Sequence, residues 1–380
     1  MNHSALQVYL LRVIEGEESG LAAGLVRVFL SGLEFIYRFL SGLQFRMIRR
    51  HKLPVPVLSV GNITAGGTGK TPTVIWLVKL MKDAGFHPAI LTRGYRGASE
   101  KEGLIFSHRD LGNLSPAQTG DEPFLLAKLL PDTLIGVGRE RYRNALKILE
   151  QDPATNLFIL DDGFQHWSLF RDLDIVLIDA SRPFGNRHLL PRGFLREPLS
   201  GLKRAGIILL TRSAKVGEEQ KNQLIAELLA IQPRAAVTAI KEETSELIPF
   251  TVFARGDDGH AVIPAADFLK GRKVSAITGI GNPRQFLASL ETMGAEVGYF
   301  KAYPDHYRWE ETEITDLMKG LAENGFTELI VTAKDGVKLE SWIDSFEKSG
   351  MTCYILSLDC QVVDERVIQR VKDGAKRRPV

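Results

Sequence analysis

This chain of 380 residues has few cysteines, almost no net charge and no long apolar run. Cys353 and Cys360 lie in one late segment without a metal-ligand pattern, which favours two free thiols and no disulfide. No stretch of about 18 uncharged apolar residues occurs, and the N-terminus lacks the pattern of a secretory signal, so we expect neither secretion nor a membrane-spanning helix. A net charge of +2 gives no overall field for nucleic acid, so none is expected as a partner. The length allows two domains.

The most informative stretch is residues 64–72, which lie between a predicted apolar strand (55–60) and a predicted amphipathic helix (73–84). Small residues let backbone N–H groups surround a polyphosphate, Lys70 can reach its outer phosphates, and the Thr71 hydroxyl can ligate Mg²⁺. The strict pattern has glycine where this chain has Thr64, so the loop is a variant. A Gly-rich turn alone would explain the glycines but not the Lys-Thr pair between strand and helix. We predict nucleotide binding by Gly66, Gly67, Thr68, Gly69, Lys70 and Thr71.

Short apolar runs follow this loop, and each is followed by polar, glycine-containing or helical sequence. This alternation predicts an α/β fold with a doubly wound parallel sheet of the phosphate-loop NTPase type, whose site lies at the carboxyl ends of the strands. The predicted strands are 87–92, 133–137, 157–160, 174–178 and 206–210.

Acidic and basic residues gather in the loops after these strands. Asp161 and Asp162 end the most apolar run, where phosphate-loop enzymes hold Mg²⁺, although two turn or capping aspartates would look the same. Asp121 precedes a helix predicted over 124–130. Its position suits a helix N-cap and a catalytic base equally well. The basic run 185–198 suits a loop that grips an anionic substrate, or a solvated loop.

Residues 20–50 predict a helix with one polar stripe and an apolar face that covers most of the remainder. Between Arg27 and Lys52 there are six Lys or Arg residues against the single acid Glu34, a local balance of +5. We interpret this segment as an interfacial helix on an anionic membrane surface. The alternative is a helix packed on its own domain or in a dimer.

The pattern after residue 232 predicts β-like pieces at 235–240 and 250–254, and a second α/β unit from residue 273. The Gly279 to Pro283 segment has Arg284 in place of a third glycine, so we predict no second cofactor site. His306 lies in an aromatic loop, a setting more typical of a buried structural histidine.

Taken in order, these motifs resemble those of the tetraacyldisaccharide 4'-kinases of lipid A biosynthesis. The resemblance covers roughly residues 20–340, and its departures, Arg212 and Ala333, concern nucleobase contacts. The matching motifs are residues 59–62, 66–72, 93–95, 120–123, 160–166, 190–191, 195–198, 279–283 and 305–307.

The resemblance implies ATP-dependent, Mg²⁺-dependent phosphorylation of the 4'-hydroxyl of a tetraacylated glucosamine disaccharide 1-phosphate. It also implies a peripheral enzyme at the cytoplasmic face of the bacterial inner membrane, without an obligate protein partner. Its domains would be a membrane-surface helix (1–52), a phosphate-loop kinase domain (53–240), a smaller α/β domain with a β-ribbon connector (241–368) and a basic tail (369–380).

The resemblance also assigns roles to single residues. Asp121 would be the base, His306 its partner, and Arg141 a cation beside the reacting phosphoryl group, with Lys70 on the phosphates. The metal would be held by Thr71, Asp161, Asp162 and Glu122. The substrate would be bound by Asn62, Tyr95, Arg196 and Glu197.

Two other classes of protein share some of these features. A membrane-associated phosphate-loop ATPase would act on a protein partner, and a lipid-binding scaffold would leave the acids unexplained.

Overall fold

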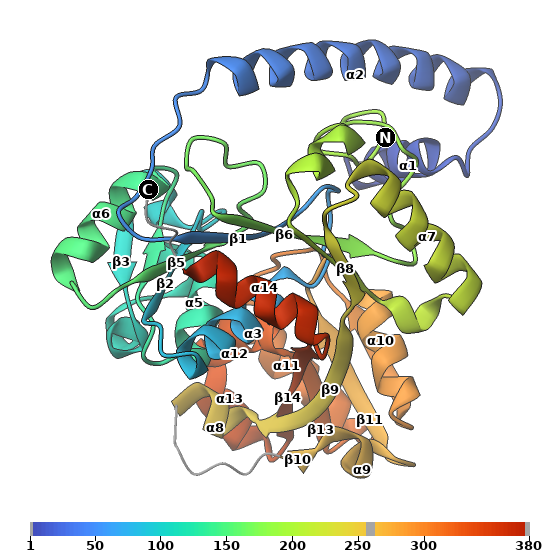
Figure 1. The fold of residues 1–380 in the computed structure, drawn as a ribbon. Helices are drawn as coiled ribbons and strands as arrows, with labels where there is room; N and C mark the ends of the chain where they lie inside the picture. Colours follow the sequence, from blue (N-terminus) through green and yellow to red (C-terminus); the bar gives the residue numbers. More distant parts are fainter. Residues whose placement is uncertain (1–2, 256–262, 377–380) are drawn as a thin grey trace.

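The computed structural model describes residues 3–255 and 263–376, which form two β-sheets with helices packed against them (Figure 1). The first sheet is parallel throughout except for β3, which pairs antiparallel with β4 at one edge. The predicted doubly wound parallel sheet is therefore confirmed. In spatial order its strands are β3 (Leu104–Phe106), β4 (Ile135–Val137), β2 (Pro88–Thr92), β5 (Leu157–Asp161), β1 (Val57–Asn62), β6 (Leu173–Asp179), β7 (Ile207–Thr211) and β8 (Ala236–Ala239).

Helices cover both faces of this sheet, and α3 (Lys70–Asp83) begins directly after the phosphate loop. Its start is set by Gly69, whose φ of 82° lies in the left-handed region that glycine adopts without strain. Because β1 and β5 are neighbours, the phosphate loop and the Asp161-Asp162 pair lie at the same edge of the sheet. The other helices here are α14 (Glu365–Ala375), which comes from the end of the chain, and α4 (Pro116–Thr119), α5 (Asp121–Leu129), α6 (Arg141–Gln151) and α7 (Glu218–Ile231).

The second sheet is reached through β9, which is separated from the end of β8 by a single residue, Ile240. β9 pairs antiparallel with β14, and β14 then leads back to a helix on the first sheet, so two antiparallel strands connect the units. In spatial order the strands are β10 (Ile263–Pro264), β9 (Lys241–Pro249), β14 (Thr352–Gln361), β13 (Glu328–Thr332), β11 (Lys273–Thr278) and β12 (Glu296–Ala302). Its helices are α8 (Phe250–Arg255), α9 (Ala265–Leu269), α10 (Pro283–Thr292), α11 (Glu311–Glu323), α12 (Ala333–Leu339) and α13 (Ile343–Ser349).

Two segments differ from the sequence predictions. Residues 250–254 are not β-like but belong to α8, because Phe250 and Phe253, three positions apart, bury the same helix face in the second core. Residues 369–375 of the predicted basic tail (369–380) instead continue α14, and residues 377–380 lie outside the described part of the chain. The apolar residues of α14 recur every four positions and pack against the first sheet; they are Val367, Val371 and Ala375.

Helix α5 belongs to both hydrophobic cores. Leu126 and Ala127 pack in the core of the first sheet, whereas Phe124 and Leu125 pack among residues of the second unit. The start of α5, where Asp121 lies, is therefore fixed at the junction of the two units.

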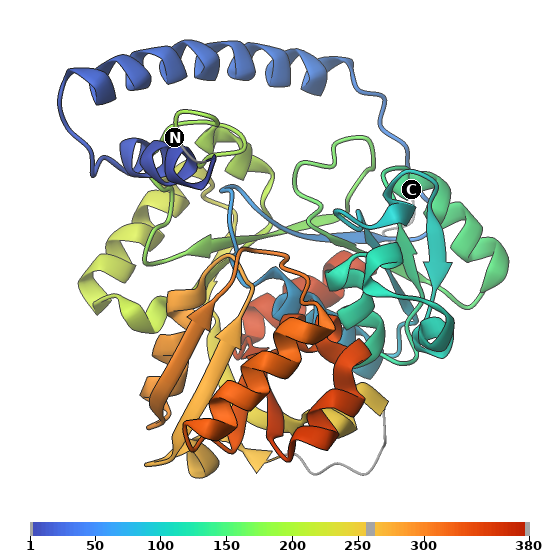
Figure 2. The ribbon, with the colours of Figure 1, turned by 180° about the vertical axis from the view of Figure 1, so that it is seen from behind.

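The N-terminal segment forms α1 (His3–Glu15) and α2 (Leu21–Met47), which confirms the predicted long helix. Helix α2 runs along one end of the molecule, and α1 lies beneath the N-terminal end of α2 (Figures 1 and 2). Among residues 3–255 and 263–376, none of the helices is both long enough and apolar enough to cross a membrane.

Candidate active site

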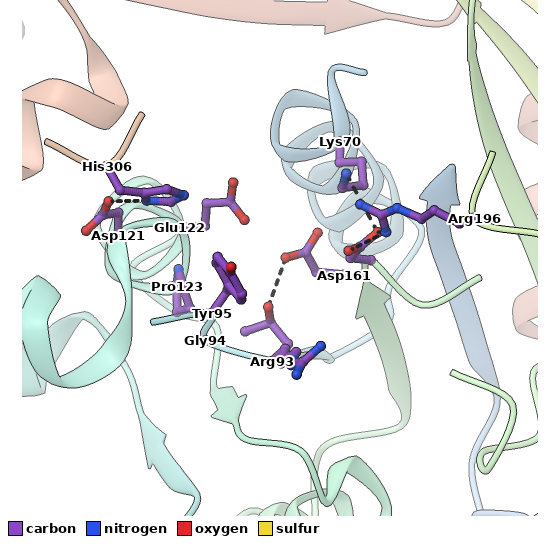
Figure 3. Close-up of a pocket in the computed structure, with 12 residues that line it drawn as sticks. Lys70, Arg93, Gly94, Tyr95, Asp121, Glu122, Pro123, Asp161, Arg196 and His306 are labelled. Carbon is purple, nitrogen blue, oxygen red and sulfur yellow. Dashed lines mark hydrogen bonds and ion pairs between the residues drawn. The ribbon is translucent and has the colours of Figure 1, made fainter. Parts of the chain in front are cut away.

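A cavity of about 310 Å³ lies between the carboxyl edge of the first sheet and a loop of the second unit (Figure 3). It brings together predicted site residues from distant parts of the sequence, and only His306 comes from the second unit. The lining residues are Lys70, Thr92, Arg93, Gly94, Tyr95, Asp121, Glu122, Pro123, Asp161, Asp162, Arg196 and His306.

The phosphate loop beside this cavity has the features that a polyphosphate needs. A Cβ atom on Gly66 or Gly67 would meet nothing within 4 Å, so the backbone there is open to a ligand. Thr68 is buried, and its Oγ1 has no hydrogen-bond partner among the described residues. Such an orphan hydroxyl fits a phosphate oxygen as its missing acceptor. Arg212 closes the loop from outside by donating to the Gly67 carbonyl at 2.7 Å.

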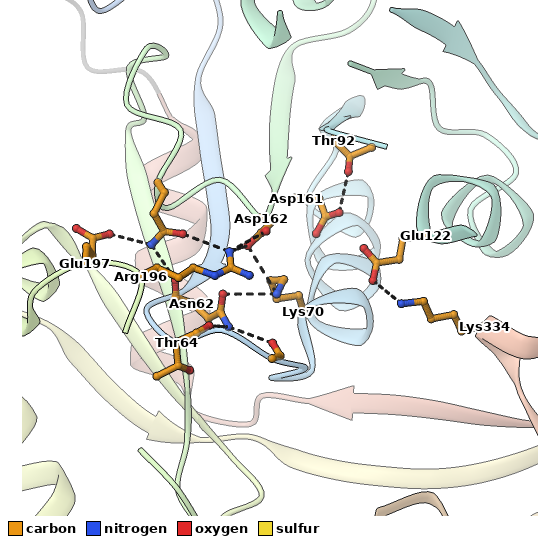
Figure 4. A network of polar contacts seen from close by, with 12 residues as sticks. Asn62, Thr64, Lys70, Thr92, Glu122, Asp161, Asp162, Arg196, Glu197 and Lys334 are labelled. Carbon is orange, nitrogen blue, oxygen red and sulfur yellow. Dashed lines mark hydrogen bonds and ion pairs between the residues drawn. The ribbon is translucent and has the colours of Figure 1, made fainter. Parts of the chain in front are cut away.

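Lys70 Nζ lies 3.5 Å from Asn62 Oδ1 and 3.6 Å from Asp162 Oδ1 (Figure 4). Arg196 Nη1 donates to both carboxylate oxygens of Asp162 at 2.9 Å. Burial alone would raise the pKa of Asp162, but Lys70 and Arg196 outweigh it and hold that pKa below its usual value. Asp162 is therefore an ionised carboxylate shared by two cations.

Asp161 is in a different environment although it is the next residue. Its carboxylate is buried and accepts a hydrogen bond from Thr92 Oγ1 at 2.9 Å. Burial, together with the negative charges of Glu122 and Asp162, raises the pKa of Asp161 to about 6. The positive charge of Lys70 and the hydrogen bond from Thr92 oppose this rise without cancelling it.

The donors at this edge suit Mg²⁺ rather than a metal held by protein alone. In the described part of the chain, no group of three or more His, Cys, Asp or Glu side chains could hold a metal ion. Mg²⁺ at a nucleotide usually takes only one or two carboxylates and completes its shell with phosphate and water. Asp161 and the hydroxyl of Thr71, in the first turn of α3, provide such oxygen donors.

Asp121 and His306 meet across the junction of the two units. Nδ1 of His306 lies 2.9 Å from Oδ2 of Asp121, although the residues are 185 positions apart. Burial would raise the pKa of Asp121, but the His306 hydrogen bond and the nearby charges of Lys338 and Lys334 lower it below its usual value. The carboxylate therefore stays ionised and can accept a further hydrogen bond.

Helix α12 supplies two lysines that the sequence reasoning missed. Lys334 Nζ pairs with Glu122 Oε1 at 3.0 Å across the junction. One turn later, Lys338 Nζ lies 2.8 Å from the fully buried Asp335 and donates to the Gly279 carbonyl at 3.2 Å. Their spacing of four residues places both on one helix face, but no sequence signal indicates that this face meets α5.

Several predicted site residues do not line the cavity. Arg141 is buried behind it, where Nη1 donates to the Asp162 carbonyl at 3.2 Å. Glu197 accepts from Arg204 at 2.7 Å and from Gln165 at 2.8 Å, while Asn62 donates to the Thr64 carbonyl at 2.6 Å. These side chains support the loops around the cavity. Five residues of the phosphate loop also lie outside the cavity lining: Gly66, Gly67, Thr68, Gly69 and Thr71.

Comparison with known proteins decides the family. The sequence model of LpxK, tetraacyldisaccharide-1-P 4'-kinase, matches residues 26–375. This chain belongs to that family. Proteins named tetraacyldisaccharide 4'-kinase from Syntrophus aciditrophicus and Halothermothrix orenii are 36% and 34% identical to it. These alignments cover 86% and 93% of this chain, and 87% and 94% of the relatives.

The fold agrees with this 4'-kinase family. A crystal structure described as the "apo" form of LpxK from Aquifex aeolicus in complex with ATP has a TM-score of 0.69 and 30% identity. The match covers 92% of this chain and all of that one. The predicted activity, an ATP-dependent 4'-kinase of lipid A biosynthesis, is therefore confirmed at the level of the family.

Proposed function

We propose that this tetraacyldisaccharide 4'-kinase uses Asp121, oriented by His306, as the proton acceptor for the 4'-hydroxyl of its lipid-linked disaccharide substrate. The observation that carries this proposal is the 2.9 Å contact between the two side chains at the edge of a cavity that also contains Lys70. Glu122 in the same cavity is also held from the second unit, by Lys334, but among the lining residues only the partner of Asp121, His306, faces the cavity itself.

A carboxylate is too weak a base to deprotonate a sugar alcohol in advance. As the hydroxyl oxygen bonds to the γ-phosphorus, the bond from phosphorus to the bridging oxygen breaks and ADP leaves. The hydroxyl proton passes to Asp121 during this step. His306 donates from Nδ1 to Oδ2, which leaves Oδ1 as the carboxylate oxygen available to the acceptor.

The phosphate loop and Lys70 bind and orient the phosphates of ATP in this proposal. Asp161 and Thr71 would hold Mg²⁺, which when bound neutralises charge on the phosphates. Asp162 does not act as a direct ligand, because its oxygens are already shared by Lys70 and Arg196. Glu122 is assigned to the ion pair with Lys334 rather than to metal.

At the cavity mouth, the half-exposed ring of Tyr95 and the guanidinium of Arg196 are the groups available to the acceptor. The buried Asn62 and Glu197 support them from behind. Arg141 likewise fixes the backbone at Asp162 rather than touching the transferred group.

Replacing Lys70 tests the nucleotide part of the proposal. Lys70→Ala should lower turnover at saturating ATP at least about 10²-fold, because phosphoryl transfer relies on positioning and charge neutralisation. Lys79→Ala, which removes an exposed lysine from the same helix, is the matched control and should have little effect. The measurement is the rate of phosphorylated lipid formation with and without acylated disaccharide. Normal turnover by Lys70→Ala, or ATP hydrolysis unaffected by the acceptor, would rule the proposal out.

We further propose that α2 lies on the cytoplasmic leaflet of the inner membrane. Its apolar side chains recur at helical spacing along one stripe, here called the outer face, and are 42–90% exposed. Its polar side contacts the protein: Arg27 donates to the Val13 carbonyl, and Glu34 pairs with His188. A helix that turns its apolar stripe away from its own protein fits an anionic lipid surface. The outer face comprises Leu21, Leu25, Val28, Phe29, Phe35, Ile36, Phe39, Leu40, Leu43 and Met47.

A further inference from the structure

The inner side of α2 is bonded to the loop that carries Arg196. Glu34 accepts a hydrogen bond from the Leu189 backbone at 2.8 Å and lies 2.9 Å from Nδ1 of His188. One helical turn further, the Tyr37 hydroxyl donates to the Arg196 carbonyl at 2.7 Å. Both side chains thus bond to the 185–198 loop, and the ring of Tyr37 also packs against the hydrophobic cluster that contains Leu189 and Leu195.

This loop is in turn bonded to the phosphate loop. The Arg196 N–H donates to the Ile63 carbonyl at 2.8 Å, and the Ala65 N–H donates to the Phe194 carbonyl at 2.7 Å. The backbone of Arg196 is therefore held on one side by the start of the phosphate loop and on the other by Tyr37 of α2.

The side chain of Arg196 then reaches the cavity. Its two 2.9 Å contacts hold Asp162, which also faces Lys70 (Figure 4). A small displacement of the Arg196 backbone would move the guanidinium relative to Asp162 and to the phosphate-binding lysine. Such displacements are costly, because phosphoryl transfer depends on the positions of its charges.

We propose that Tyr37 and Glu34 are positioning residues for the kinase reaction, which hold Arg196 in place from the helix that meets the lipid surface. Their link makes α2 a support of the active site as well as a membrane contact. The role of Arg196 in this inference rests on the proposed function. The lipid contact of α2 is tested separately from the positioning.

A double-mutant cycle between Tyr37 and Arg196 tests the link. Tyr37→Phe removes one hydroxyl and leaves the Arg196 carbonyl without its donor, so kcat should fall about threefold to tenfold. The KM for ATP and binding to phosphatidylglycerol-containing vesicles should not change. In an Arg196→Ala background, the same Tyr37→Phe change should alter kcat by less than about twofold, since the group being positioned is gone.

Variants at Glu34 provide an independent check. Glu34→Leu removes both loop contacts and should lower kcat, whereas Glu34→Gln should restore most of it, because the amide oxygen still accepts from the Leu189 N–H. Ser41→Ala is the control on the same helix, since its hydroxyl bonds only within α2, to the Arg38 carbonyl. This control should keep the wild-type kcat.

The outcomes separate the positioning role from the rest of the account. Losses at Tyr37 and Arg196 that simply multiply would overturn the positioning role, as would a normal kcat for both Tyr37→Phe and Glu34→Leu. Wild-type activity in Arg196→Ala would instead overturn the proposed role of Arg196. If Tyr37→Phe lowers vesicle binding along with kcat, the helix has been displaced as a whole, and the positioning role again fails.

Discussion

His166 is a neutral histidine packed behind the cavity between two arginines. Its Nε2 lies 3.0 Å from Ser168 Oγ, and Arg171 donates to its carbonyl at 2.7 Å. Burial, with the positive charges of Arg141 and Arg171, lowers the pKa of His166 to about 3. The unfolded chain, with a histidine pKa of 6.5, therefore binds one more proton than the folded protein between these values.

Stability should consequently fall as the pH drops from about 6.5 towards 3, by up to about 1.4 kcal/mol per pH unit from this residue. His166→Asn removes the titrating group, so the variant should lose less stability between pH 7 and pH 5. The measurement is the difference in thermal midpoint at the two pH values for wild type and variant. An equal difference in both proteins would show that His166 is not held neutral.

Single residues were predictable where a local motif defines them. The glycine-rich loop after one predicted strand predicts the roles of Lys70 and Thr71. The acidic pair after another predicted strand does the same for Asp161 and Asp162. The contact between Asp121 and His306 could not be read from either loop, because it depends on how two units pack. Family resemblance suggested it, and the structure places the two side chains together.

At the scale of elements, the outer face of α2 makes the clearest prediction. Phe29→Asp combined with Phe39→Asp places two charges where apolar side chains are exposed, and should move the protein from vesicle-bound to soluble fractions. High salt should weaken attachment of the wild type, because basic residues also contribute. Val363→Asp, at an exposed valine outside α2, is the control. Partitioning that changes neither with mutation nor with salt would favour a helix that serves only internal packing or a dimer.

Periodicity predicted long elements well and short ones poorly. The run of apolar residues in α2 and the buried strands of the first sheet are strong signals. Helix α8 has only six residues, and its two phenylalanines suit a strand as well as a helix. Helix α14 was obscured by its many charges, although its valines have helical spacing.

At the scale of the whole molecule, the two units share α5 and are connected by β9 and β14. We propose that α1 and α2 form the membrane-surface part, the first sheet with α14 the phosphate-loop domain, and the second sheet the smaller domain. The site needs both domains, because Asp121 begins α5 while His306 lies in the second unit. No property of either half of the sequence could indicate how closely they meet.

The most direct test of this account is a kinetic cycle on the pair that joins the two domains. Asp121→Ala and His306→Ala should each lower kcat by about 10²–10⁴-fold, because general-base catalysis typically contributes a rate enhancement of this size. The affinity for ATP should change little. The double variant should lose far less than the product of the two single losses, because residues that act as a unit are not additive. Losses that multiply would show that Asp121 and His306 act separately, and would contradict the proposed mechanism.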